Sequence, residues 1–370
     1  MSLVVLFGFG LLALSLTVQN PQQADTRDSV VVRDTTRFEQ VFVYGLQGRV
    51  AAGLVFLDSL EESSLTPRQS ELRKKFYTRF RSIDEKLQPK TDDTAVIRLI
   101  RMYDNYWRNG LLDNAGIPHY DTMLADSVSQ YLLEFDPALR AKPILEIQDD
   151  FPKFLSDFLQ SRGVYSAVGR TGQLFDLLLH TRETESHYNV TTPEDTVTVK
   201  VVFMENTISN GWEEYATFGR YFPGGWATDD ALYCVRETYD TASENFTISY
   251  LKHEGKHFAD YKRFPKLTGT DLEYRAKLVE LSYARKSLYD LIAIFMRNSL
   301  SDRNNPHAFA NHCVMRDLAR QCQFDDKAGN LEVWKKAPIS MINASATSLL
   351  RQNTSALIMA GADTVSTVLQ

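Results

Sequence analysis

Two histidines and a glutamate stand close together in the stretch LKHEGKHFADYKRF, residues 251–264. His253, Glu254 and His257 form the pattern H-E-x-x-H. If this stretch is helical, residues four apart share a face, so both imidazoles can reach one metal ion. Glu254 is turned by about 100° from His253 on such a helix, so it can sit beside the metal without binding it. The pattern predicts a catalytic Zn²⁺ site in which Glu254 is the general base for a zinc-activated water.

A catalytic zinc usually has three protein ligands and one open position, so the sequence must supply a third ligand. Pro265 and Gly269 permit a turn after the first predicted helix, and the next predicted helix can then run back antiparallel to it. This second helix carries Glu273 and Glu280, which are seven residues apart and therefore lie on one face. Spacing alone leaves both carboxylates open as the third ligand.

Each of these residues also has an ordinary structural interpretation. By composition alone, an H-E-x-x-H pattern arises in about one chain of this kind in a hundred. Thr270 and Glu273 fit a capping box at the start of a helix, and Glu280 can pair with a lysine on a solvated face. The zinc interpretation is favoured because the motif falls on a predicted helix, follows a strand region and meets carboxylates on a returning helix.

The stretch from this motif through the second helix resembles the gluzincin metallopeptidases, which are zinc enzymes with H-E-x-x-H on one helix and a glutamate ligand on the next. The resemblance implies that His253 and His257 are zinc ligands, that Glu254 is the base and that a downstream glutamate is the third ligand. Some families of this group carry a second acid seven residues after the ligand glutamate. By that likeness Glu273 is the preferred ligand and Glu280 supports the ligands, with Glu280 kept as the alternative ligand. No third histidine at metzincin spacing and no Met-turn follows, which disfavours a metzincin.

Other polar side chains are weaker candidates for roles at the site. Asp260 is a candidate for orienting a ligand imidazole, although pairing with Lys256 or Arg263 on the helix surface is the simpler expectation. Residues 224–235 precede the site helix, either as an edge strand that adds an extended peptide or as a core strand. The candidates for a hydrogen bond to an oxyanion, each more often a core residue, are His312, Tyr250 and Tyr283. The remaining histidines have no partner pattern and receive no role: His119, His180, His187 and His307.

Length and composition are ordinary for a folded soluble protein. The chain has 370 residues, of which 44% are hydrophobic and 24% are charged. Its formal net charge of −6 argues against a nucleic-acid partner, which requires a basic face. The three cysteines, Cys234, Cys313 and Cys322, form no C-x-x-C pattern and are too few for a disulfide framework. A cysteine-based zinc site is therefore not expected.

Residues 1–20 are predicted to be a signal peptide or a membrane anchor. The run from Leu3 to about Val18 is apolar and uncharged, and its length is short for a spanning helix but typical of an export signal. Residues 21–37 are polar and are predicted to form a flexible connector. The protein is therefore expected to be exported: secreted, periplasmic or anchored to face outside. An uncleaved anchor and a misassigned start codon are the alternatives for the leader.

The part of the chain after the connector begins with a predicted helical N-terminal region, residues 38–189. Apolar residues recur there at spacings of three and four, which is typical of amphipathic helices. Within this region, residues 152–181 are predicted to form two helices that are broken near Gly163 or Gly169. Its function does not follow from the sequence.

Residues 190–345 are predicted to form the catalytic region. Residues 195–205, DTVTVKVVFME, alternate and are rich in Val and Thr, which predicts a strand, and several short strands are expected after it. The predicted helices that follow cover residues 247–264, 271–298 and 305–322. Residues 346–370 are weakly patterned and are predicted to be a C-terminal tail. A small sheet followed by a helical pair indicates an α+β, helix-rich fold with a zincin-like catalytic region.

The sequence therefore predicts a zinc metallopeptidase that hydrolyses peptide bonds in a peptide or protein substrate. The alternative is an exported, helix-rich binding or envelope protein whose zinc is structural or absent. The number of ligands distinguishes the two, because a structural zinc site is closed by a fourth protein ligand.

Overall fold

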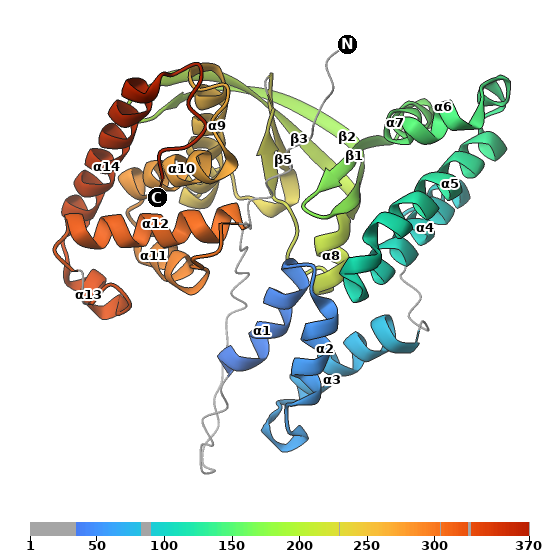
Figure 1. The fold of residues 1–370 in the computed structure, drawn as a ribbon, viewed down its shortest axis with the longest axis horizontal. Helices are drawn as coiled ribbons and strands as arrows, with labels where there is room; N and C mark the ends of the chain where they lie inside the picture. Colours follow the sequence, from blue (N-terminus) through green and yellow to red (C-terminus); the bar gives the residue numbers. More distant parts are fainter. Residues whose placement is uncertain (1–34, 83–89, 229, 304, 325–326, 370) are drawn as a thin grey trace. The chain divides into compact units, whose positions relative to one another are not determined.

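The computed structural model describes residues 35–82, 90–228, 230–303, 305–324 and 327–369 (Figure 1). The predicted leader lies outside the described residues, and so does most of the predicted connector. The chain divides into two compact units: unit 1 comprises Met1–Glu183 with Met204–Gly224, and unit 2 comprises Thr184–Phe203 with Gly225–Gln370. Among the described helices, none is long and apolar enough to cross a membrane.

Unit 1 consists mainly of helices that bury one apolar face each. They are α1 (Thr35–Leu46), α2 (Val50–Asp58), α3 (Pro67–Tyr77), α4 (Thr94–Leu112), α5 (Ile117–Phe135), α6 (Ile144–Asp149), α7 (Phe151–Ser161) and α8 (Gly211–Thr217). Helix α4 is an example of how the sequence determines where a helix begins and which face it buries. Asp93 caps its first turn by accepting hydrogen bonds from two backbone amides, and Leu99 and Tyr103 are buried one turn apart.

The prediction of two helices at residues 152–181 is wrong for its second half. Helix α7 ends at Ser161, and the chain continues as strands β1 (Tyr165–Thr171) and β2 (Leu174–Thr191), which pair as an antiparallel hairpin. Gly163 and Gly172 have φ values of +73° and +58°, in the left-handed region that glycine adopts without strain. The first follows the end of the helix, and the second forms the tight turn of the hairpin.

The five-stranded sheet has the order β1-β2-β3-β5-β4. The predicted strand at residues 195–205 is confirmed as β3 (Thr196–Asn210). The short strands β4 (Gly225–Ala227) and β5 (Leu232–Val235) pair antiparallel, and β4 ends the sheet. Among the described strands, the edge strand anticipated at residues 224–235 is therefore β4, whereas β5 is paired on both sides.

The helices of unit 2 surround α10, which packs against α9, α12 and α14 (Figure 1). These helices are α9 (Leu251–Arg263), α10 (Gly269–Tyr283), α11 (Leu288–Arg297), α12 (Pro306–Gln321), α13 (Leu331–Lys336) and α14 (Ile339–Ala360). A π-helical turn, Asn245–Tyr250, leads directly into α9. The predicted helix at residues 247–264 and the predicted α+β, helix-rich class are confirmed.

Two predictions for the second half of the chain are wrong. Residues 271–298 form two helices, because the backbone of Ala284 is extended and ends α10. The weakly patterned segment after residue 345 is largely helical, since α14 continues to Ala360. Its Leu350 and Leu357 are fully buried, so tertiary packing stabilises a helix whose many Ser, Thr and Asn residues have low helix propensity.

Candidate metal centre

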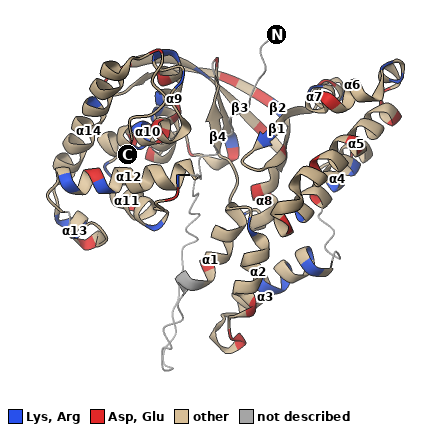
Figure 2. Cartoon of the chain, in the orientation of Figure 1, with Lys and Arg blue, Asp and Glu red and all other residues tan. Residues whose placement is uncertain are grey.

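His253, His257 and Glu273 lie together in unit 2, where α9 packs against α10. Their side chains are 0%, 7% and 1% exposed, respectively. Charged residues of both signs are interspersed along these two helices (Figure 2). Because charged side chains are rarely buried without partners, this burial calls for a specific explanation.

The three side chains converge with the spacing of metal ligands. Nε2 of His257 lies 3.1 Å from Nε2 of His253 and 3.1 Å from Oε1 of Glu273. Nε2 of His253 lies 3.6 Å from Oε2 of Glu273. Ligands bound tetrahedrally to zinc at about 2.0–2.2 Å are separated from each other by about 3.3–3.6 Å. The triangle of donor atoms is therefore of the size that one zinc ion requires.

Unsatisfied polar atoms also fit a bound cation. Both carboxylate oxygens of Glu273 and Nδ1 of His257 are buried and have no hydrogen-bond partner among the described residues. Leaving a buried carboxylate without hydrogen bonds is costly. A metal ion between the imidazoles and the carboxylate would satisfy Glu273 directly, so the residues present fit the group that the motif implies.

The carboxylates around His253 favour a positive charge at the triangle. Burial alone would lower the pKa of His253, but Glu273 and Glu280 outweigh it and raise that pKa to about 10. Burial opposes the charge of Glu273 too, yet His307, Lys277 and His253 hold its pKa well below the usual range. The pocket therefore attracts a cation, either a proton on His253 or a metal ion.

Glu280 lies behind His253 and outside the triangle. Its Oε1 is 2.7 Å from Nδ1 of His253, on the side of the imidazole away from His257 and Glu273. A hydrogen bond from Nδ1–H to this carboxylate fixes the tautomer and leaves the lone pair of Nε2 for a metal. Of the two glutamates that spacing left open, Glu273 joins the imidazoles and Glu280 orients one of them.

Replacing Glu280 by glutamine is expected to weaken zinc binding about 10- to 100-fold, because the imidazole loses the carboxylate that orients it. The affinity is measured by competition with a chromophoric chelator at fixed pH. Glu332→Gln provides the control, since this glutamate is 66% exposed and pairs only with Lys335 in the described structure. An unchanged zinc affinity in Glu280→Gln would remove Glu280 from the metal centre.

Glu254 is buried beside the triangle but does not belong to it. The side chain is 2% exposed, and its Oε1 has no hydrogen-bond partner among the described residues. Burial raises the pKa of this carboxyl to about 7, against the opposing effect of His257 and His253. A carboxyl that titrates near neutral pH is suited to accept and return a proton.

The capping-box interpretation of Thr270 and Glu273 is wrong. Helix α10 begins at Gly269, so its N-cap position is Thr268 rather than Thr270. The hydroxyl of Thr268 donates to Asp271 at 3.0 Å. Glu273 is consequently free of a capping role and points to the histidines of α9.

The structure does not bring the other predicted side chains into the triangle. Tyr250 is fully buried and donates its hydroxyl hydrogen bond to the carbonyl of Tyr233 at 2.7 Å. The ring of His312 stacks on Phe309, and Tyr283 lies beneath the ammonium of Lys252. These contacts are structural.

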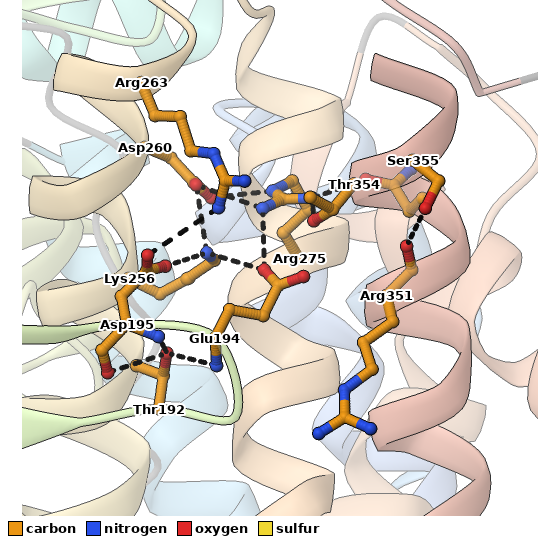
Figure 3. Close-up of polar contacts among 11 residues, drawn as sticks. Thr192, Glu194, Asp195, Lys256, Asp260, Arg263, Arg275, Arg351, Thr354 and Ser355 are labelled. Carbon is orange, nitrogen blue, oxygen red and sulfur yellow. Dashed lines mark hydrogen bonds and ion pairs between the residues drawn. The ribbon is translucent and has the colours of Figure 1, made fainter. Parts of the chain in front are cut away.

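Asp260 belongs to a buried ion network instead of orienting a ligand imidazole (Figure 3). It accepts two hydrogen bonds from Arg275, at 2.7 and 3.1 Å, and lies 3.0 Å from Nζ of Lys256. Lys256 also reaches Glu194 at 3.1 Å and Asp195 at 3.0 Å, in the turn between β2 and β3. The expected partner Lys256 is therefore found, but in the interior rather than on the surface.

Arg275 joins this network to a third helix. Its Nη1 donates to the side chains of Asn353 and Thr354 of α14, both at 2.8 Å, and its Nη2 donates to Glu194 at 3.1 Å (Figure 3). Lys256 and Arg275 are fully buried and lie within two residues of the candidate ligands His257 and Glu273. The network therefore fixes α9 and α10, which carry the candidate ligands, against α14 and the β2–β3 turn.

Helix α9 approaches the sheet closely at Gly255. A Cβ atom at this position would lie only 2.8 Å from Cγ1 of Val190 in β2. Glycine in a helix interior costs about 1 kcal/mol relative to alanine, so the close approach explains why glycine is present. This contact sets how α9 lies on β2.

Sequence reasoning gave no role to His307, yet the structure places it beside Glu273 of the candidate metal centre. Its Nδ1 lies 2.9 Å from Oε2 of Glu273. His307 belongs to α12, two helices further along the chain, so no local spacing connects it with the H-E-x-x-H motif. The buried network around Arg275 was missed for the same reason.

Comparison with known proteins identified no similar protein. No protein-family model matches the chain, and neither a curated protein nor a solved structure is significantly similar to it. The function of this chain is therefore argued from the geometry of its own side chains.

Proposed function

We propose that this protein is a zinc-dependent metallopeptidase. The observation that carries the proposal is the number of ligands in the triangle. Among the described residues, His253, His257 and Glu273 form a group that no fourth His, Cys, Asp or Glu joins. Three protein ligands leave a position open for water and substrate, whereas a structural zinc is closed by four.

The arrangement of the elements supports a zincin-like organisation of unit 2. His253 pairs with Glu280, whereas His257 faces Glu273, so α9 and α10 run antiparallel. Helix α9 also packs against the short strands β4 and β5. The edge strand β4 has one side without a paired strand in the described structure, where an extended peptide substrate can add.

The chemistry of the proposed reaction divides between the metal and Glu254. A bound zinc would lower the pKa of water and polarise the scissile carbonyl. Glu254, whose own carboxylate is not needed as a ligand, accepts the proton of the attacking water and returns it to the leaving amine. Glu280 keeps His253 in the ligating tautomer. The proposed substrate is a peptide or protein, and we propose an exported location because the apolar run from Leu3 to about Val18 is typical of an export signal.

Metal content tests the proposal directly. Elemental analysis of the purified chain is expected to give one zinc per molecule, and His253→Ala is expected to lose it because only two ligands remain. His187→Ala is the matched control, since His187 is exposed on β2. Cleavage of a mixed peptide library by the zinc-loaded wild type should then be abolished by a chelator and restored by zinc. Absence of zinc after supply at neutral pH would overturn the proposal in favour of a binding protein.

A further inference from the structure

His307 reaches the ligand Glu273 from a partly exposed position. It lies in the first turn of α12, which is fixed by Asn305, whose side chain accepts from the backbone amide of Ala308 at 3.1 Å. The side chain of His307 is 26% exposed, whereas that of Glu273 is 1% exposed. Nδ1 and Oε2 lie 2.9 Å apart as an ion pair, close enough for an N–H to donate to the carboxylate once the imidazole is aligned with it, although the two side chains as placed do not form that hydrogen bond.

The two oxygens of Glu273 have different surroundings. Oε1 lies 3.1 Å from Nε2 of His257, on the side of the ligand triangle. Oε2 lies 2.9 Å from His307 and 3.4 Å from Nζ of Lys277. A carboxylate that binds a metal through one oxygen is usually held by a partner on the other.

Of the two neighbours of Oε2, His307 is the one that can fix the orientation of the Glu273 carboxylate. Lys277 ends in a rotatable ammonium on a flexible stem, and it is further from the carboxylate. The imidazole is planar, and its Nδ1 has a single fixed direction for donating a hydrogen bond. His307 does not belong to the ligand group itself, so among the described residues it acts on the site through Glu273.

We propose that His307 is a positioning residue that holds Oε2 of Glu273 and thereby presents Oε1 to the metal. This inference rests on the proposed zinc function. It requires that loss of His307 weaken metal binding while the two histidine ligands stay in place. The cost of losing such a partner is about 10- to 100-fold in metal affinity.

Zinc affinity of the full chain, measured by chelator competition, tests this role with three variants. His307→Ala removes the donor and is expected to bind zinc about 10- to 100-fold more weakly than wild type. His307→Asn places an amide N–H at the branch point where imidazole carries Nδ1, so it is expected to restore most of the affinity. His312→Ala, on the same helix and stacked on Phe309, is the control and should bind zinc as wild type does.

Co²⁺ substitution provides a second readout that fold stability alone does not move. The visible spectrum of the Co²⁺-loaded protein should change in His307→Ala and return towards wild type in His307→Asn, because it reports the ligand geometry. Wild-type zinc affinity in His307→Ala, or equal weakening in both His307 variants, would overturn the role of His307 alone. Failure of the wild-type chain to bind zinc would instead overturn the proposed function.

Discussion

Replacing Glu254 by glutamine is expected to slow peptide hydrolysis by about 10²- to 10⁴-fold while zinc stays bound. Glutamine has nearly the same shape as glutamate, but its amide cannot accept the proton of the attacking water. Glu254 lies outside the triangle of His253, His257 and Glu273, so the metal ligands are not altered. The buried position already holds a carboxyl whose pKa is raised to about 7 by burial, and a neutral amide is tolerated there.

The loss of hydrolysis is measured as the single-turnover rate on one cleaved peptide, and the retention of zinc is measured as the zinc content of the same sample. Glu185→Gln is the control, because Glu185 is exposed on β2 and should retain the wild-type rate. Hydrolysis that survives in Glu254→Gln would remove Glu254 from the role of base. Loss of zinc together with activity would show that Glu254 helps to hold the metal.

Replacing Arg275 by methionine is expected to lower the free energy of unfolding of unit 2 by about 3–5 kcal/mol. The guanidinium makes the hydrogen bonds that compensate Asp260 at 2.7 and 3.1 Å, and the carboxylate is fully buried. Lys256 stays 3.0 Å from Asp260 but is shared with Glu194 and Asp195, so removing the guanidinium leaves buried negative charge that one ammonium does not compensate. Urea unfolding of the metal-free protein, followed by circular dichroism, measures the change.

A surface pair supplies the control for this loss. Arg98→Met breaks a pair with Glu134 in which both side chains are about half exposed, so the expected change is about 0–1 kcal/mol. The double variant Arg275→Met with Asp260→Leu removes both charges and should recover part of the stability lost in Arg275→Met. Equal effects of Arg275→Met and Arg98→Met would contradict the importance of the buried network.

The residues of the candidate site that lie close together in the chain could be predicted from the sequence. The spacing of His253 and His257 and the turn signals at Pro265 and Gly269 are local, and local patterns predict helices and the faces of helices. The likeness to gluzincins favoured Glu273 as the ligand and Glu280 as its support; in the structure Glu273 lies 3.1 Å from Nε2 of His257, and Glu280 contacts Nδ1 of His253.

The hairpin of β1 and β2 was predicted as a helix because its signal is ambiguous. From Leu177 to His180 every residue of β2 is buried, so apolar and polar positions do not alternate as they do in a half-exposed strand. A short apolar run of this kind fits a helix as well as a strand. The break predicted near Gly163 or Gly169 did not indicate which structure followed it, and the hairpin turn falls instead at Gly172.

Contacts between distant segments could not be predicted from spacing. His307 reaches Glu273 from α12, and Lys256 of α9 reaches Glu194 in the turn between β2 and β3. From the sequence, Lys256 and Arg275 are expected on solvent-exposed helix faces, as charged helix residues usually are. Only the packing of α10 among three other helices shows that these charges are buried and must pair with one another.

The close approach of Gly255 to Val190 has a consequence for how this protein can evolve. An alanine at position 255 favours the helix in isolation, yet its Cβ would lie 2.8 Å from a Val190 methyl. A side chain at position 255 therefore requires a shorter residue at position 190, or α9 moves off the sheet. We expect the two positions to covary among relatives of this chain, in addition to the H-E-x-x-H pattern.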